Sequence, residues 1–222
     1  EWIDYSEQML RREIEKIPDG VYEAPVGWLD DDGKNRDKPL RVACKVIVEG
    51  SDITIDLTGS NEEVETGFNV PFHGSTLVGA YYIVRAMLLD EVRSEVFIPQ
   101  NEGIFRPVKV IAPEGSIYNP RFPRACFSRF NQCQRFADST LLALSEVIPD
   151  KVTAGNSAHT HFISYSGFDE ETNQYWMYLE VNEGSYGGRY GSDGPDSVDN
   201  LIANTRNNPI EELELRLPLR TE

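Results

Sequence analysis

Residues 183–209, EGSYGGRYGSDGPDSVDNLIANTRNNP, combine residue types that could do chemistry. The stretch holds five glycines, several hydroxyl and amide side chains, and Arg189 between Gly188 and Tyr190. Glycine lets backbone N–H groups approach a ligand or a developing oxyanion closely, and a guanidinium suits carboxylate or phosphate. From its residues alone, the stretch is equally consistent with a functional loop and with a structural crossover.

The same stretch lacks the pattern of a nucleotide-binding loop. A dinucleotide site needs Gly-x-Gly-x-x-Gly between a strand and a helix, and a P-loop needs Gly-Lys followed by Ser or Thr. The segment YGGRYGSDG has neither the spacing nor the lysine. The sequence therefore predicts no nucleotide site of either kind in this chain.

Two further loops carry polar groups beside proline and glycine, where binding sites tend to lie. The segment IPQNEGIFRP places Asn101, Glu102 and Gly103 just before a predicted strand. The segment SIYNPRFPRA carries two prolines and two arginines through an irregular stretch. Ordinary turn chemistry explains both loops equally well.

Two histidines and one acidic turn raise the question of a metal site. His159 and His161 are two residues apart in a predicted strand and so face the same side, but spacing marks no third ligand. The run DDDG at residues 30–33 resembles the centre of a calcium loop, yet Trp28 and Pro39 then occupy positions that need carboxylates. We therefore predict an ordinary turn there and no metal ligands in this chain.

Composition argues against several classes of protein. The 222 residues carry a formal net charge of −16, whereas nucleic-acid binding needs clustered Lys and Arg. No apolar run approaches the roughly 20 residues that span a bilayer. Three cysteines without ligand spacing indicate buried free thiols in a reducing compartment. We expect a cytoplasmic protein that contacts neither nucleic acid nor membrane.

Hydrophobic periodicity predicts a mixture of helices and strands. Helical spacing occurs over residues 4–17, 74–89 and 129–148. Strand-like alternation covers residues 39–59 (a hairpin turning at Gly50-Ser51), 106–113, 159–167, 173–181 and the tail, 210–222. The mixture lacks a regular βαβ rhythm, so the predicted class is α+β, with a mixed, mainly antiparallel sheet and packed helices. Without repeats or a clear linker, residues 1–222 are predicted to form one domain.

Five segments, taken in order, resemble the hydantoinase B/5-oxoprolinase family. They are DYSEQMLRREIEKIPDGVYEA, ITIDLTGSNEEVETGFNVP, NEGIFRPVKVIAPEGSIYNP, EGSYGGRYGSDGPDS and NTRNNPIEELELRLPLR. The matches run from about residue 4 to residue 220; each motif is weak alone, and five in this order are specific. The chain departs from the family pattern at residues 199–203, DNLIA, where many members carry a histidine before Asn-Thr-Arg.

The resemblance implies a subunit of an ATP-dependent enzyme. Family members include N-methylhydantoinases, 5-oxoprolinases, caprolactamase-like lactamases, and acetone and acetophenone carboxylases. In such enzymes a hydantoinase A-type chain binds ATP and phosphorylates the substrate oxygen, and the B-type chain completes hydrolysis or carboxylation. By this resemblance ATP belongs to the partner, the assembly is a hetero-oligomer, and any divalent metal is held by family sequence outside this segment. The chain begins at Glu1 without Met and is expected to be the central region of a B-type subunit.

The leading hypothesis is hydrolysis of a cyclic amide, because phosphorylation of the carbonyl oxygen creates a good leaving group. We predict Glu183 and Asp193 as general acid/base groups and Arg189 as the cation for developing negative charge. The predicted substrate-binding residues are Gly187, Gly188, Asn101, Glu102, Asn204 and Arg206. Two alternatives stay open: the corresponding subunit of an acetone- or acetophenone-type carboxylase, which acts on a ketone, and a non-catalytic assembly domain.

Overall fold

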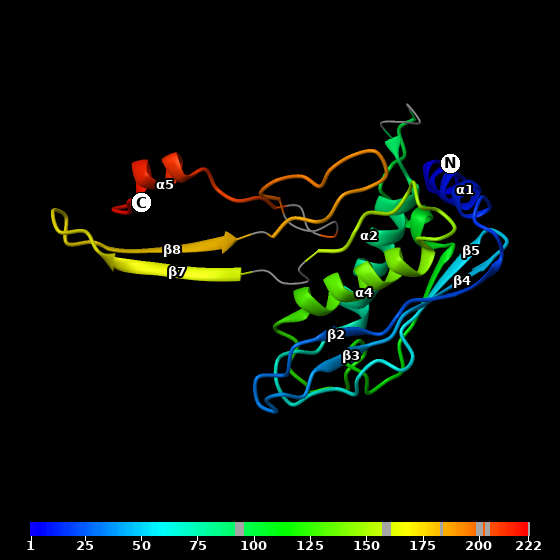
Figure 1. The fold of residues 1–222 in the computed structure, drawn as a ribbon, viewed down its shortest axis with the longest axis horizontal. Coiled ribbons are helices and arrows are strands. Elements are labelled where there is room, and N and C mark those ends of the chain that lie inside the picture. The colour runs from blue at the N-terminus through cyan, green and yellow to red at the C-terminus, as the bar shows by residue number, and fades with distance from the viewer. Residues whose placement is uncertain (92–95, 157–160, 183, 199–201, 203–204, 222) are drawn as a thin grey trace.

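The computed structural model describes the chain except for residues 92–95, 157–160, 183, 199–201, 203–204 and 222. In Figure 1, helices α1 (Trp2–Ile14), α2 (Leu77–Leu88) and α4 (Arg129–Leu144) gather with the sheets at one end. The hairpin of β7 (His161–Phe168) and β8 (Tyr175–Asn182) extends away from them, with the C-terminal helix above it. The described chain therefore consists of a helix-packed body and a projecting hairpin, which we call the arm hairpin.

A four-stranded sheet forms the centre of the body. Its strand order is β1 (Gly20–Glu23), β4 (Lys45–Glu49), β5 (Asp52–Asp56) and β6 (Val108–Ile111). The pairs β1–β4 and β4–β5 are antiparallel, whereas β5 and β6 are parallel. This mixed, mainly antiparallel arrangement with packed helices confirms the predicted α+β class.

The predicted hairpin over residues 39–59 is confirmed as β4 and β5, but its first run is split. Leu40–Val42 forms β3, which pairs antiparallel with β2 (Gly27–Leu29) in a separate two-stranded sheet. The β4–β5 turn passes through Gly50, whose φ of 60° lies in the left-handed region that favours glycine. The backbone between residues 42 and 45 therefore leaves one sheet and enters another, which alternation alone does not reveal.

The three predicted helices are all present and bury most of their apolar residues; Val78 on α2 and Phe130 on α4 are exposed, which their periodicity did not predict. On α1 the buried residues include Leu10 and Ile14, while Met9 is partly buried. The second helix begins as a π-helical turn, Phe72–Thr76, which continues into α2, and α4 ends at Leu144 rather than at residue 148. Their apolar faces form one core with the sheet, which includes Val46, Val48, Ile53, Ile55, Ile83, Met87, Phe136 and Leu141.

Helices α2 and α4 approach each other closely at Gly79. A Cβ at Gly79 would lie 2.8 Å from the ring of Phe136, so this position must be glycine for the helices to pack as they do. The fully buried Phe136 ring meets Tyr118 edge-on, with ring centroids 5.5 Å apart. The Tyr118 hydroxyl donates to the carbonyl oxygen of Gln132 at 2.9 Å, and burial raises the pKa of Tyr118. These contacts fix the position of α4 in the body.

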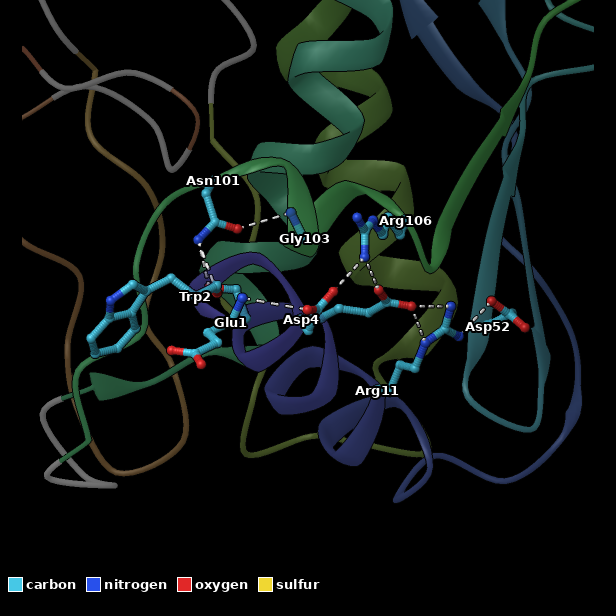
Figure 2. Close-up of polar contacts among 10 residues, drawn as sticks. Glu1, Trp2, Asp4, Arg11, Asp52, Asn101, Gly103 and Arg106 are labelled. Atoms are coloured by element: carbon cyan, nitrogen blue, oxygen red, sulfur yellow. Dashed lines mark hydrogen bonds and ion pairs between the residues drawn. The ribbon is translucent and has the colours of Figure 1, made fainter.

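An ion-pair network ties α1 to the chain around it (Figure 2). The guanidinium of Arg106 lies 3.0 Å from the carboxylate of Asp4 and 2.8 Å from that of Glu7. Arg11 lies 2.8 Å from Asp52, at the start of β5. The hydrogen bond from Arg106 lowers the pKa of Glu7. Each exposed ion pair of this kind contributes little to the free energy of unfolding. The network therefore orients α1 more than it stabilises the fold.

The predicted tail strand is wrong, because Ile210–Arg216 forms helix α5. Pro209 precedes its first turn, which contains two glutamates, and Arg216 pairs with Glu212 one turn away at 2.7 Å. Glu, Leu and Arg all favour helix. Ile210 and Leu213 also fit helical spacing, so the alternating leucines of the tail were compatible with both structures.

The two strands predicted before the glycine-rich stretch are confirmed as the arm hairpin, which pairs antiparallel from residue 161 to residue 182. One face of the arm hairpin is next to the C-terminal segment: Asn208 donates to the hydroxyl of Tyr178 at 2.7 Å. The opposite face presents Phe162, Ser164, Ser166, Phe168, Tyr175, Met177, Leu179 and Val181. Its larger apolar side chains are 48–68% exposed, apart from the partly buried Val181. The arm hairpin thus has one partly covered face and one open apolar face.

The cysteines are free thiols, as predicted. Cys44 and Cys133 are buried, and burial raises the pKa of each to about 12. Thiols held in this state are poor nucleophiles, because the thiolate is the reactive form. Their role in the described structure is packing.

Replacing Phe136 by Ala should lower the free energy of unfolding by about 3–5 kcal/mol, since it removes a fully buried ring and leaves a cavity. Denaturant unfolding followed by circular dichroism measures the change. Phe130→Ala is the matched control on the same helix, because Phe130 is 48% exposed and should cost about 1 kcal/mol or less. Equal losses for the two variants would contradict the described packing of α4.

Candidate functional site

The glycine-rich loop, residues 184–194, packs against the segment that follows α4. The N–H of Ala154 donates to the carbonyl oxygen of Gly188 at 2.8 Å, and the N–H of Gly187 donates to that of Ala154 at 3.2 Å. Single bridge pairs join Thr153 to Arg189 and Asn156 to Tyr186. The loop is therefore held by backbone pairing between segments at least 30 residues apart in sequence.

A tight turn closes the loop at Arg189 and Ser192. The N–H of Arg189 donates to the carbonyl oxygen of Ser192 at 2.9 Å, and the N–H of Ser192 donates back at 3.0 Å. Gly191 adopts a φ of 74° within this turn, a conformation that favours glycine. The N–H groups of Gly187 and Arg189 thus donate to carbonyl oxygens of the protein itself. A ligand at this loop would therefore be bound by its side chains rather than by these two backbone donors.

Two glycines are required by close packing. A Cβ at Gly187 would lie 2.5 Å from the Cβ of Ala154, and a Cβ at Gly194 would overlap the carbonyl oxygen of Tyr186. Both contacts are too short for any other residue unless the backbone moves. At these two positions, glycine lets the loop reach its neighbours.

Tyr186 and Arg189 line a cavity of about 350 Å³, which we call the Arg189 cavity. Its charged lining consists of Asp90, Glu91, Asp150, Lys151 and Arg189, and its apolar lining includes Met87, Leu89 and Val152. Arg85, on α2, lies 2.7 Å from Glu91 and fixes that carboxylate at the edge of the cavity. Two cations and three carboxylates around one small space can bind a polar molecule and place proton-accepting groups beside it.

Asn101 and Glu102 lie at the 3-10 turn Glu102–Phe105, beside α1 (Figure 2). Asn101 Oδ1 accepts from the N–H of Gly103 at 2.9 Å, and its Nδ2 donates to Ser6 Oγ at 2.9 Å and to the carbonyl oxygen of Trp2 at 3.2 Å. Glu102 is exposed. In the described structure Asn101 is committed to joining α1 to this turn, and neither residue lines the Arg189 cavity.

The remaining predicted site residues fall into three groups. Gly187 and Gly188 lie in the paired part of the glycine-rich loop, and Asp193 follows its closing turn with an exposed side chain. Arg206 is exposed and forms a bridge pair with Val198 on the way to α5. Glu183 and Asn204 lie outside the described residues.

Sequence reasoning missed Asp138, on the side of α4 that faces β2. Its carboxylate accepts from Asn156 Nδ2 at 3.0 Å and from the backbone N–H of Asn156 at 3.4 Å, and Arg135 Nη1 lies 3.8 Å away. Burial raises the pKa of Asp138 to about 6, against the hydrogen bond from Asn156 and the charge of Arg135, which lower it. The local sequence shows only a polar residue beside an apolar stripe, because the segment that buries Asp138 arrives from 18 residues away.

The acidic run at residues 30–33 forms a turn, as predicted. Asp32 Oδ1 accepts from the N–H groups of Lys34 at 3.0 Å and Asn35 at 2.6 Å. Within the described part of the chain, no group of three or more His, Cys, Asp or Glu side chains could hold a metal ion. His161 is described and exposed, whereas His159 lies outside the described residues. Over the same described residues, no helix is long and apolar enough to cross a membrane.

The fold occurs in two solved enzymes. An ATP-dependent caprolactamase from Pseudomonas jessenii superposes with a TM-score of 0.78 over 97% of this chain and 37% of its own, at 23% sequence identity. A nucleotide-free acetone carboxylase superposes with a TM-score of 0.78 over 95% of this chain and 29% of its own, at 17% identity. At these identities the comparison establishes a shared fold.

Sequence comparison gives the family. The family model described as hydantoinase B/oxoprolinase matches residues 1–222. A Pseudomonas sp. (strain NS671) protein, named as the B-type subunit of a D-/L-hydantoinase, is 45% identical over 224 residues, 99% of this chain. A 5-oxoprolinase of Dictyostelium discoideum is 28% identical over 193 residues, 86% of this chain and 13% of its own length. The chain belongs to the hydantoinase B/oxoprolinase family, which confirms the resemblance of its five motifs.

The chain spans 37% of the length of the Pseudomonas sp. relative. A match over nearly all of this chain therefore corresponds to about a third of that protein.

The raised pKa of Asp138 makes the stability of the protein depend on pH. The folded state binds this proton more tightly than the unfolded state, so the stabilisation is complete below about pH 4 and is lost as pH rises through about 6. Over that window, Asp138→Asn should gain about 2 kcal/mol of unfolding free energy relative to the wild type, because tenfold in proton affinity is about 1.4 kcal/mol. Urea titrations at pH 4, 5, 6 and 7 measure this difference. Asp150→Asn is the control, and parallel pH profiles for wild type and Asp138→Asn would contradict the described burial.

Proposed function

We propose that this chain is the central region of a B-type subunit in an ATP-dependent cyclic amide hydrolase. The observation that carries the proposal is the 45% identity, over nearly the whole chain, to a relative named as the B-type subunit of a hydantoinase. The names of two further relatives support it, because 5-oxoproline and caprolactam are both cyclic amides. The proposed reaction is ring opening of a hydantoin-like or lactam-like substrate whose oxygen has been phosphorylated.

In this proposal ATP is bound by an A-type partner and not by this chain. The absence of a Gly-x-x-x-x-Gly-Lys segment from the sequence supports that division of labour. Any divalent metal that the reaction uses is proposed to lie in family sequence outside residues 1–222. The task left to this chain is to hold the activated substrate and to stabilise its charges.

The Arg189 cavity supports the second part of that task, the stabilisation of charge. Arg189 and Lys151 supply two cations for a phosphorylated or developing anionic group, and the neighbouring carboxylates can take up or deliver a proton. Asp193 directly follows Ser192, which closes the tight turn that begins at Arg189. We therefore keep Arg189 as the charge-stabilising group and Asp193, with Glu183, as the proposed acid/base groups.

The first test measures ADP release by the complete complex of the B-type chain and its A-type partner. Hydantoins, 5-oxoproline and caprolactam are supplied without bicarbonate, and acetone and acetophenone are supplied with it. The proposal expects ADP release coupled to ring opening of one cyclic amide. Release only with a ketone and bicarbonate would replace it by the carboxylase alternative.

Within that complex, Arg189→Ala should lower kcat by about 100-fold, the order expected for removing one charge-stabilising group. Arg12→Ala is the matched control, since Arg12 lies on the outer part of α1 and contacts only Met9 among the contacts that the structure describes. Size-exclusion chromatography shows whether assembly persists in both variants. Unchanged turnover in Arg189→Ala, with assembly intact, would favour the non-catalytic assembly role.

The open face of the arm hairpin supports assembly with the A-type partner. None of its eight side chains is charged, although the whole chain carries a formal charge of −16. Monomeric proteins rarely expose contiguous apolar patches of this kind, and such patches mark contact surfaces. A neutral apolar face can bury against a partner without leaving unpaired charges.

A charge placed on this face should weaken the complex. The side chain of Met177 is 68% exposed. Met177→Lys is expected to reduce affinity for the A-type partner by about tenfold or more, as substitutions at the buried centre of an interface do. Val21→Lys, at a position 65% exposed on β1, is the control for an added surface lysine. Affinity is measured by surface plasmon resonance, and thermal unfolding checks that both variants fold. Equal affinities for the two variants would place the contact elsewhere.

A further inference from the structure

A second cavity, of about 380 Å³, lies between α4 and the strand β2. We call it the Asp138 cavity. Thr153 lines both this cavity and the Arg189 cavity, so the two spaces share one wall. Of the described residues that the sequence predicted as catalytic or substrate-binding, none lines the Asp138 cavity.

One wall of the Asp138 cavity presents a donor and an acceptor side by side. Arg135 and Asp138 are neighbours on one face of α4, with Arg135 Nη1 3.8 Å from the Asp138 carboxylate. Arg135 Nε and Thr153 Oγ1 are buried and have no hydrogen-bond partner among the described residues. A buried donor without a partner costs free energy, and a ligand acceptor at Arg135 Nε would remove that cost.

The carboxylate of Asp138 is held in place by its neighbours. Asn156 donates to it twice, from Nδ2 and from the backbone N–H, and a Cβ at Gly155 would lie 3.3 Å from one of its oxygens. Each carboxylate oxygen has two lone pairs, so these bonds leave capacity to accept from a ligand. Burial raises the pKa of Asp138 to about 6, and near neutral pH the group is therefore an ionised acceptor.

The rest of the lining is largely apolar. It includes Pro25, Val26 and Trp28 from the segment around β2, and Leu141 and Leu142 from α4. Gly27 keeps the space beside Arg135 open, since a Cβ there would lie 3.1 Å from Arg135 Cδ and 3.2 Å from Ser139 Oγ. An apolar wall with a few fixed polar groups is the usual character of a small-molecule site.

We propose that the Asp138 cavity binds the amide edge of a small cyclic amide, with Arg135 Nε donating to its carbonyl oxygen and Asp138 accepting from its N–H. A ring forces the carbonyl and the N–H of an amide onto the same edge, which matches a donor and an acceptor one helical turn apart. The ring methylenes then lie against Trp28 and Leu142. The substrate class rests on the proposed function, whereas the position of the site rests on the cavity and its unpartnered donor.

The test measures binding of ε-caprolactam and N-methylcaprolactam to the complete B-type protein by isothermal titration calorimetry, without ATP or the A-type partner. Caprolactam should bind at least about tenfold more tightly, because the N-methyl compound leaves the Asp138 acceptor unpaired. In Asp138→Asn this preference should disappear, since the amide nitrogen of Asn can face the ligand with a donor. Arg135→Met should lower the affinity for both lactams by about tenfold or more, because it removes the donor to their carbonyl oxygen.

Arg129→Met is the matched control on α4, because Arg129 stacks on Phe130 away from the Asp138 cavity. It should bind both lactams as the wild type does, and circular dichroism confirms that every variant is folded. Equal binding of the two lactams by the wild type, an unchanged preference in Asp138→Asn, or no binding of caprolactam at its highest soluble concentration would each overturn the proposal.

The proposed lactam site in the Asp138 cavity and the proposed function can be rejected independently of each other. If the complete complex opens cyclic amides and Arg135→Met leaves KM unchanged, the Asp138 cavity is not the site and the function stands. If the complex shows no ring opening but the complete B-type protein prefers caprolactam over its N-methyl form in an Asp138-dependent way, the site stands and the function does not.

Discussion

The close approach of α2 and α4 at Gly79 is the constraint on which the rest of the described structure depends. Because Gly79 has no side chain, the Phe136 ring can fill the space between the two helices and meet Tyr118 in the core. Packing of this density leaves α4 one orientation. That orientation points Phe136 inward, and it brings Arg135 and Asp138 to the β2 side of the helix.

The position of α4 is passed on to the glycine-rich loop through hydrogen bonds. Asp138 holds Asn156 by two bonds, and the segment around Ala154 in turn pairs with Gly187 and Gly188. Arg189 reaches its cavity only because this pairing places the loop there. The high glycine content of the loop is explained by close packing at two positions and a left-handed turn at a third. The groups available for chemistry are side chains beside those glycines.

The arm hairpin differs from the body in what stabilises it. The strands of the body bury one face against three helices, whereas the arm hairpin has an open apolar face and only two strands. A two-stranded hairpin is marginally stable in water by itself. Its role in the proposed assembly and its own stability therefore depend on the same surface.

Local patterns in the sequence were enough to specify most of the elements. Periodicity predicted α1, α2, α4, the β4–β5 hairpin and the arm hairpin, because an amphipathic face is written into neighbouring residues. The order of five short motifs was enough to indicate the family. Periodicity failed for the tail, where the leucines fit a strand and a helix alike and only the helix preference of Glu, Leu and Arg separates the two.

The environment of each candidate site residue, by contrast, came from the folded chain. Asn101 looked like a ligand group, but its amide is used in joining α1 to the turn before β6. Asp138 carried no signal in the sequence, yet a segment 18 residues further along the chain buries it and raises its pKa. Burial and hydrogen bonding are set by residues distant in sequence, so no local pattern could assign them. Residue type determined what each group can do, and packing determined what surrounds it.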